Sequence, residues 1–384
     1  MISNKFSSKS FIRLLSTFCL VCLSACEKPP TITEPKSEFL SYDTIKAWDI
    51  TTYAAWGANP QKFYDSLGKE IDLLTFAKNA GVNTLRVRIL TGKPVYPHAT
   101  VEQLLDLAKQ AKQQQLALWL DFHYSDVWAD PGNQSAPARW LNLPLEALTD
   151  TLKEYTLTVV QQFTQQGTEP SIVQIGNEIT PGMLWPKGKF SGKIEEASVV
   201  AKLFNAGAQG AKIAAPNTQI MLHVAGSATT IAWIADFYQK ANFEFDVWGF
   251  SYYGFWHGCE AHNFIKTCKS ICGTSKKPFI IAETAHPFTL SWLDQCHNAI
   301  GNANQLCTDF SADPKKQLDW LAHVWSTAKQ TIYFRGMAYW EPAFVTKKEF
   351  SCDSQLNGGG SSWENMCLFD FNHHALPAAY FNWK

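Results

Sequence analysis

Short apolar runs alternate with longer amphipathic segments through most of the chain. Apolar runs of about four to eight residues between turn-forming residues predict buried β-strands, whereas apolar positions three and four residues apart predict helices. The runs predict strands at residues 46–50, 83–89, 116–122, 172–176, 219–223, 246–251, 278–282 and 335–340. Strands that alternate with helices are typical of repeated βα units, in which the strands are parallel.

Two of the intervening segments show the helical pattern most clearly, at residues 101–115 and 145–166, and Thr100 is a suitable N-cap for the first. Eight strands with interleaved helices predict a single (β/α)8 TIM barrel, which we assign to residues 43–384. No Gly-rich phosphate loop follows the first strand, which disfavours a dinucleotide-binding fold. Extended loops rich in Pro, Trp and Cys follow the later strands, at the face where such barrels carry their active sites.

The N-terminal segment has the features of an export signal. Basic residues precede an apolar stretch at residues 14–23, which is too short to span a bilayer but has the length of a signal peptide. The stretch ends in the sequence LSAC at residues 23–26, which resembles the lipobox of bacterial lipoproteins. In that interpretation residues 1–25 are a lipoprotein signal peptide and Cys26 is lipidated, whereas a simple cleaved signal peptide is the alternative.

The segment between Cys26 and the barrel is short and rich in Pro, Ser and Thr. Residues 26–42 therefore read as a flexible spacer between anchor and domain. Glu27, rather than Asp, follows Cys26, as in lipoproteins sorted to an outer membrane. We expect an exported, membrane-anchored lipoprotein in the outer membrane, the periplasm or at the cell surface.

Composition narrows the functional classes. Hydrophobic residues make up 46% of the chain and charged residues 17%, which argues for a folded protein rather than a disordered one. The formal net charge of -1, without a long run of Lys or Arg, makes nucleic-acid binding improbable. Aromatic residues reach 14%, including 15 Trp. Flat apolar rings with a polar edge suit stacking against sugars, although part of this content will belong to the core.

Seven cysteines follow Cys26, and all lie in the last third of the chain. In an exported protein they predict disulfides between loops, and the odd number leaves at least one thiol unpaired. A zinc site is the alternative, but the spacing lacks two CxxC pairs. The sequence does not determine the pairing among Cys259, Cys268, Cys272, Cys296, Cys307, Cys352 and Cys367.

Two glutamates stand at the ends of predicted strands, in the sequences IGNE and IAET. Glu178 lies two residues beyond the fourth strand, and Glu283 directly follows the seventh. A carboxylate beside an apolar strand is costly unless it is paired or functional, so two at matched positions indicate a site. Glycoside hydrolysis requires such a pair, one carboxyl to protonate the leaving oxygen and one to attack or to activate water. A structural ion pair is the alternative for either glutamate alone.

Several stretches, in order along the chain, resemble glycoside hydrolase family 53, the endo-β-1,4-galactanases. The matching sequences are AGVNTLRVRI at 80–89, LDFHYSDVWADP at 120–131, IVQIGNEITPGMLWP at 172–186, IMLH at 220–223, FDVWGFSYY at 245–253 and AYWEPAF at 338–344. The resemblance implies a barrel with catalytic glutamates on strands four and seven. It assigns Glu178 as the general acid/base and Glu283 as the nucleophile of a retaining mechanism.

The resemblance also implies substrate-binding residues. A guanidinium beside Glu283 would keep it ionised while Glu178 stays protonated, and we favour Arg86 over Arg88 for this position. Asn177 would hold the sugar hydroxyl next to the scissile bond. Further candidates are His123 and Tyr253, to orient substrate and nucleophile, and Trp128 and Trp340, as stacking platforms. Each could instead be an ordinary core residue, and structural roles are equally open for Asp49, Asp126, Asp130, His223 and Glu341, which match the family too.

Four departures from the family pattern concern the cleft. The chain has Ala285-His286-Pro287 where an Asn-Trp-Pro is usual, Val224-Ala225-Gly226 where an Asp-rich turn is usual, Gly254 in place of Pro, and Thr180 in place of Arg. We expect an intact catalytic pair in an altered sugar-binding cleft. Galactan is therefore the leading substrate, with another retaining β-glycanase (a β-mannanase or β-glucanase) or a non-catalytic glycan-binding lipoprotein as alternatives.

The expected partners are a β-1,4-galactan or related plant polysaccharide and, through the lipid, a membrane. We expect a monomer that needs no cofactor and binds no metal at the catalytic site. Some bacterial relatives bind calcium in a late loop, but no clustered Asp/Asn run in this chain assigns such a site.

Overall fold

The computed structural model describes residues 44–57, 60–94, 96–352 and 359–383. The expected signal peptide, Cys26 and the whole of the spacer lie outside these residues. No helix within the described ranges is both long enough and apolar enough to cross a membrane.

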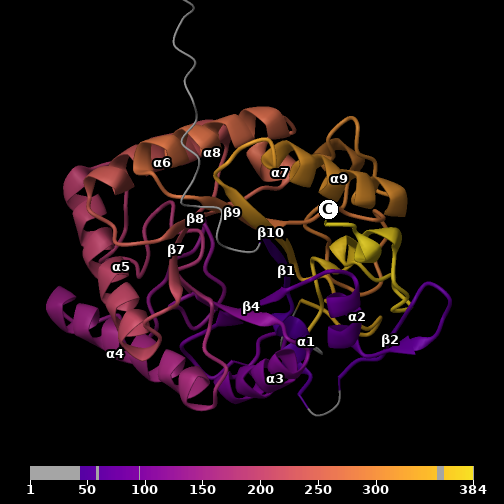
Figure 1. The fold of residues 1–384 in the computed structure, drawn as a ribbon, viewed down its shortest axis with the longest axis horizontal. Coiled ribbons are helices and arrows are strands. Elements are labelled where there is room, and N and C mark those ends of the chain that lie inside the picture. The colour runs from indigo at the N-terminus through magenta and orange to yellow at the C-terminus, as the bar shows by residue number, and fades with distance from the viewer. Residues whose placement is uncertain (1–43, 58–59, 95, 353–358, 384) are drawn as a thin grey trace, which may run out of the picture. The chain divides into compact units, whose positions relative to one another are not determined.

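Within the described residues, eight parallel strands close into a barrel in the order β1-β10-β9-β8-β7-β6-β5-β4 (Figure 1). Their bounds are β1 Ile45–Asp49, β4 Thr84–Ile89, β5 Ala117–Phe122, β6 Ile172–Ile175, β7 Gln219–Val224, β8 Val247–Ser251, β9 Phe279–Thr284 and β10 Phe334–Trp340. Each predicted strand is confirmed, with ends that differ by at most two residues. The (β/α)8 TIM barrel prediction is therefore correct. A small antiparallel pair, β2 Phe63–Tyr64 and β3 Glu70–Ile71, was not predicted.

Helices surround the barrel, as Figure 1 shows. The long ones are α3 Val101–Gln113, α4 Leu145–Gln165, α5 Ile194–Ala214, α6 Ala228–Lys240, α8 Ala261–Ser275 and α9 Pro314–Ala328, and shorter ones are α1 Thr51–Ala55, α2 Leu73–Asn79 and α7 Gly254–His257. Both predicted helices form. Thr100 caps α3 in a reciprocal capping box with Gln103, as the sequence predicts.

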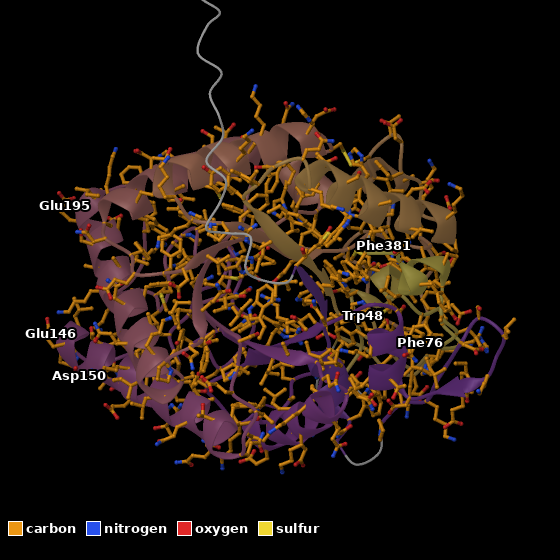
Figure 2. All side chains as sticks on the ribbon, in the orientation of Figure 1. Trp48, Phe76, Glu146, Asp150, Glu195 and Phe381 are labelled. Carbon is orange, nitrogen blue, oxygen red and sulfur yellow. A yellow bond between two sulfur atoms is a disulfide. The ribbon has the colours of Figure 1, made fainter. Side chains whose placement is uncertain are left out.

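Side chains fill the barrel, so the ring in Figure 1 encloses no channel. In Figure 2, Glu146, Asp150 and Glu195 point outward from α4 and α5, whereas Trp48 is buried and Phe76 is partly buried against the core. A large apolar core lies between the strands and the helices. A smaller one lies inside the barrel and comprises Ala47, Trp119, Ile172, Met221, Val247, Ile280, Ala282 and Ala338. This inner core supports the strand ends that carry the polar residues above it.

Disulfides connect the extended loops, as expected. In the described part of the chain, Cys259 is bonded to Cys307 and Cys296 to Cys352, and these pairs are separated by 48 and 56 residues. Cys268, Cys272 and Cys367 are free and buried. The sequence predicted at least one unpaired thiol, and the described residues contain three. Residues so far apart in sequence meet only because the loops fold over the same end of the barrel.

Candidate active site

The ends of the strands bring the predicted site residues together around one cavity of about 620 Å³. Arg86 alone of the predicted set does not line it. The predicted residues that do are His123, Trp128, Asn177, Glu178, Tyr253, Glu283 and Trp340. Residues up to 217 positions apart in sequence thus share one site, because parallel strands of a barrel all end at the same face.

The backbone at the end of β6 places Glu178 at the cavity. Gly176 has φ of 79°, and a Cβ there would lie 2.5 Å from Ile179, so only glycine fits the turn. Glu178 itself has φ of 49°, a strained conformation for a residue with a side chain. Gln134 holds this turn, because its amide nitrogen donates to the carbonyl oxygens of Asn177 at 2.7 Å and of Glu178 at 3.3 Å.

Two donors hold the carboxylate of Glu283. Arg86 lies with Nη2 2.9 Å from Oε1, and the hydroxyl of Tyr253 donates to Oε2 at 2.9 Å. The guanidinium of Arg86 is fully buried and also contacts Asp49 at 2.7 Å and Asp121 at 2.9 Å. Burial by itself would lower the pKa of Arg86, but these carboxylates raise it, so the guanidinium stays charged.

Arg86 and Arg88 both point into the protein, but only Arg86 contacts a glutamate of the pair. The guanidinium of Arg88 pairs with Asp49 at 3.2 Å and with Glu341 at 2.6 Å. It also lies against the rings of Trp128, at 4.2 Å from the centroid, and Trp340, at 5.3 Å. The structure thus gives Arg86 the position expected for it and assigns Arg88 to the support of two tryptophans.

The two glutamates lie in unlike environments. Burial, followed by repulsion from Glu283, raises the pKa of Glu178 well above its usual range, and the hydrogen bond from Ser251 opposes this only in part. Burial raises the pKa of Glu283 to about 7, against the opposing effect of Arg86. Because Arg86 touches Glu283 directly, one shared proton belongs on Glu178 and the negative charge on Glu283. From the sequence we expected Arg86 to keep Glu283 ionised. Burial nevertheless raises the pKa of Glu283 by more than Arg86 lowers it.

His123 and Asn177 are tied into the same polar network. His123 accepts a hydrogen bond from the backbone of Ala129 at 2.9 Å and lies 3.1 Å from Asp121. Asn177 Oδ1 accepts from Arg86 at 3.0 Å, and its amide nitrogen donates to the carbonyl of Ala129 at 2.8 Å. Asn177 therefore hydrogen-bonds to the side chain of Arg86 as well as to backbone. His123 and Asn177 both line the cavity.

Four tryptophans line the cavity, and two of them, Trp128 and Trp340, are the stacking platforms predicted from the sequence. Trp128 and Trp340 have ring centroids 5.7 Å apart, and Trp363 lies 4.5 Å from Trp340. Trp256 stacks on Trp363 at 6.0 Å with an angle of 6° between the rings, and it remains 44% exposed. Trp256 lies five residues after the predicted strand at 246–251 and could have been proposed on that ground, whereas Trp363 lies in a late loop without such a signal.

The departures from the family pattern have local structural reasons. Thr180, Ala225 and Gly226 line the cavity, and the Thr180 hydroxyl bonds to both the backbone nitrogen and the carbonyl of Ala225, at 2.9 and 2.7 Å. A Cβ at Gly254 would lie 2.5 Å from the sulfur of Cys307, so the disulfide occupies the space that a proline would need. His286 packs on Trp320, and the changed residues Ala285, His286 and Pro287 do not line the cavity.

One trio in the described ranges has ligand atoms close enough for a metal ion. These atoms of Glu178, His223 and Glu283 lie within 4.8 Å of one another. Each is already engaged, because Ser251 donates to Glu178, Arg86 and Tyr253 donate to Glu283, and both ring nitrogens of His223 have partners. A cation would also have to lie beside the charged Arg86. The donor set therefore suits proton transfer better than metal binding.

A (β/α)8 barrel with two buried carboxyl groups at the ends of β6 and β9, in a cavity walled by tryptophans, defines the class of glycoside hydrolases. The model of glycosyl hydrolase family 53 matches residues 45–381, and the chain belongs to this family. The family resemblance inferred from the sequence motifs is thereby confirmed.

Relatives with galactanase names match most of the chain. The endo-beta-1,4-galactanase of Bacillus subtilis (strain 168) is 29% identical, over 89% of this chain and 86% of the relative. The arabinogalactan endo-beta-1,4-galactanase of Cellvibrio japonicus (strain Ueda107) is 30% identical, over 83% and 85%. Among solved structures, the family 53 catalytic domain of Ignisphaera aggregans superimposes with a TM-score of 0.77 at 28% identity, and the match covers 90% of this chain and 96% of that one.

Proposed function

We propose that this chain cleaves β-1,4-galactosidic bonds within (arabino)galactan, as an endo-acting and retaining enzyme. The observation that carries the proposal is the buried pair of Glu178 and Glu283, which have carboxylate oxygens within 4.8 Å of each other. Retaining enzymes hold their carboxyl groups about 5 to 5.5 Å apart, whereas inverting enzymes need about 6.5 to 9.5 Å. The names of the Bacillus and Cellvibrio relatives support galactan as the substrate.

In the first step Glu283 acts as the nucleophile. Its carboxylate attacks the anomeric carbon, the glycosidic bond breaks, and Glu178 gives its proton to the departing oxygen. The contacts to Arg86 and Tyr253 favour the ionised form of Glu283 that this attack requires. The product is a glycosyl ester on Glu283 with inverted configuration.

In the second step Glu178 acts as the base. Having lost its proton, it takes one from a water molecule, which attacks the anomeric carbon and releases Glu283 as a carboxylate. Two inversions retain the β configuration. The raised pKa of Glu178 suits both roles, because the group is protonated before the first step and gains a proton in the second.

The lining residues supply sugar contacts. Trp128 and Trp340 offer ring faces held from behind by Arg88. Asn177 uses one amide N–H on Ala129, and its second N–H is available to the sugar hydroxyl next to the scissile bond. His123 also lines the cavity and is placed to contact the bound sugar.

Release of reducing ends from purified β-1,4-galactan tests this proposal. Wild-type protein is expected to act on galactan and to leave β-mannan and β-glucan intact. Preferential cleavage of either of those polymers would favour the alternative β-glycanase. Tight binding of galactan without any new reducing ends would favour the glycan-binding alternative, although binding alone does not require the carboxyl pair.

We also propose that the enzyme is exported and held at a membrane through lipidated Cys26. The supporting features are the basic and apolar segments before Cys26 and the Pro-containing spacer at 26–42. A single acyl chain anchors weakly, whereas the several chains of a lipoprotein anchor firmly. Cys26→Ser is expected to move the protein from the membrane fraction to the soluble fraction with unchanged activity per molecule. Equal partitioning of variant and wild type would contradict the anchor.

A further inference from the structure

Behind Glu178, a chain of buried side chains leads away from the cavity. The hydroxyl of Ser251, at the end of β8, donates to Glu178 Oε1 at 2.6 Å. The same hydroxyl oxygen lies 2.9 Å from Nε2 of His223 on β7. Ser251 and His223 are fully buried, and neither lines the cavity. Because the cavity does not reach them, they act on substrate only through neighbouring side chains that line it, and Ser251 donates to one of these, Glu178.

The protons along this chain can be placed from the donors around His223. The amide nitrogen of Gln174 lies 2.9 Å from Nδ1, and the backbone N–H of Glu178 donates to Nδ1 at 3.3 Å. Asn177 Oδ1 also lies 3.0 Å from Nδ1, but this oxygen already accepts from Arg86 and Gln174. Two N–H donors directed at one nitrogen require that nitrogen to be unprotonated.

His223 carries a single ring proton. Burial, assisted by the nearby positive charge of Arg86, lowers the pKa of His223 well below its usual value, so the ring is neutral. With Nδ1 accepting, the proton is on Nε2 and is donated to the oxygen of Ser251. The serine hydroxyl then has one hydrogen left, and that hydrogen goes to Glu178 Oε1.

This order of donors makes the two oxygens of Glu178 unequal. Oε1 always accepts a hydrogen bond, so a proton on the carboxyl group belongs on Oε2. Within the described residues Oε2 receives no hydrogen bond, and Glu178 lines the cavity. We propose that His223 and Ser251 are positioning residues that hold the acid proton of Glu178 on Oε2, where it meets the glycosidic oxygen. This inference rests on the proposed function, in which Glu178 is the acid.

The hydrogen-bonded side chains of His223 and Ser251 serve only one of the two glutamates, Glu178. Both oxygens of Glu283 accept hydrogen bonds, from Arg86 and from Tyr253, an arrangement that favours a carboxylate. Glu178 accepts one side-chain hydrogen bond, from a neutral donor that itself accepts from a neutral histidine. The protein therefore stabilises a charge on one glutamate and directs a proton on the other.

Comparison of two substrates in the same Ser251→Ala sample tests the inference. β-1,4-Galactan needs a protonated leaving group, whereas a dinitrophenyl β-galactobioside does not. We expect kcat/KM for galactan to fall by about 10-fold or more, as for loss of a hydrogen bond to an ionisable group, and kcat/KM for the aryl substrate to change by less than about threefold. The ratio of the two constants does not depend on the folded fraction of the sample.

Substitutions of His223 separate the donor from the space it fills. His223→Gln can keep an N–H near the position of Nε2 and is expected to preserve the wild-type ratio, whereas His223→Leu should reproduce the ratio of Ser251→Ala. Thr284→Val is the matched control, because this buried hydroxyl accepts from Trp320 at 3.0 Å and is hydrogen-bonded to neither glutamate, although Thr284 follows Glu283 in the chain. Its ratio should remain that of wild type.

An equal loss on both substrates, or no loss on either, in Ser251→Ala would overturn the inference. So would a His223→Leu variant that keeps the wild-type ratio. A wild-type protein that hydrolyses the aryl galactobioside but not galactan would instead contradict the proposed function, so the two failures are distinguishable.

Discussion

Removal of the Tyr253 hydroxyl perturbs Glu283 without emptying the space around it. Tyr253→Phe keeps the ring, which packs against Trp256 and Trp363, and deletes only the 2.9 Å hydrogen bond to Oε2 of Glu283. A hydrogen bond to a charged group contributes about 1.5 to 3 kcal/mol. Water in the adjoining cavity will replace part of it, so we take the lower limit, which corresponds to about 1 pH unit.

The sign of the effect follows from the role of Glu283. The ionised carboxylate is the reactive form, its pKa in the folded protein is about 7, and the Tyr253 hydrogen bond lowers that pKa. Its loss raises the pKa, so the acidic limb of the kcat/KM profile should move up by about 1 pH unit. At pH 6 this is a loss of about 10-fold, and near pH 9 the loss should be small.

The assay is a pH profile of kcat/KM on an aryl β-galactobioside, in which protonation of the leaving group does not limit the rate. Tyr252→Phe is the matched control, because the hydroxyl of Tyr252 donates to the carbonyl of Gly258 at 2.8 Å rather than to a carboxylate. Its profile should match that of wild type. Superimposable profiles for Tyr253→Phe and wild type, or the same displacement in the control, would refute the reasoning.

Three further predictions concern stability and binding. Because the pKa of Glu283 is raised from 4.5 to about 7, this group alone should remove about 3 kcal/mol of unfolding free energy as pH rises through that range. Glu283→Gln should therefore lose less stability than wild type between pH 5 and pH 8, which thermal melts at the two pH values will compare. Replacement of Cys259 and Cys307 by Ala should cost about 4 kcal/mol in urea unfolding, and a cost below about 1 kcal/mol would contradict this. Trp256→Ala should raise KM for galactan about fivefold, whereas Trp233→Ala, on the exposed face of α6, should leave it unchanged.

The barrel could be predicted because its strands are buried and apolar. Each strand is a short run bounded by polar residues, and the helices between them have apolar faces. The carboxyl pair followed from the same pattern, since Glu178 and Glu283 interrupt the apolar runs at equivalent points. Alternate residues of a strand share a side, which predicted that Arg86 and Arg88 point the same way but did not by itself decide which of them contacts Glu283.

The loops and the polar network could not be predicted in the same way. The disulfides join residues at least 48 positions apart, and their pairing depends on how the loops cross the barrel end. Trp363 reaches the cavity from a segment without regular strand or helix pattern. Ser251 is one small polar residue at the end of a strand, and nothing in its sequence context distinguishes a donor to Glu178 from a hydroxyl bonded to backbone.

The anomeric configuration of azide products tests the division of labour between the two glutamates most directly. Glu178→Ala, assayed with an aryl β-galactobioside and azide, should still form the ester on Glu283, and azide should then displace it with a second inversion to give the β-galactosyl azide. Glu283→Ala cannot form the ester, so direct displacement should yield at most the α-azide. Opposite anomers from the two variants, assigned by NMR, are the predicted result. The same anomer from both, or wild-type cleavage of galactan by either, would contradict the mechanism.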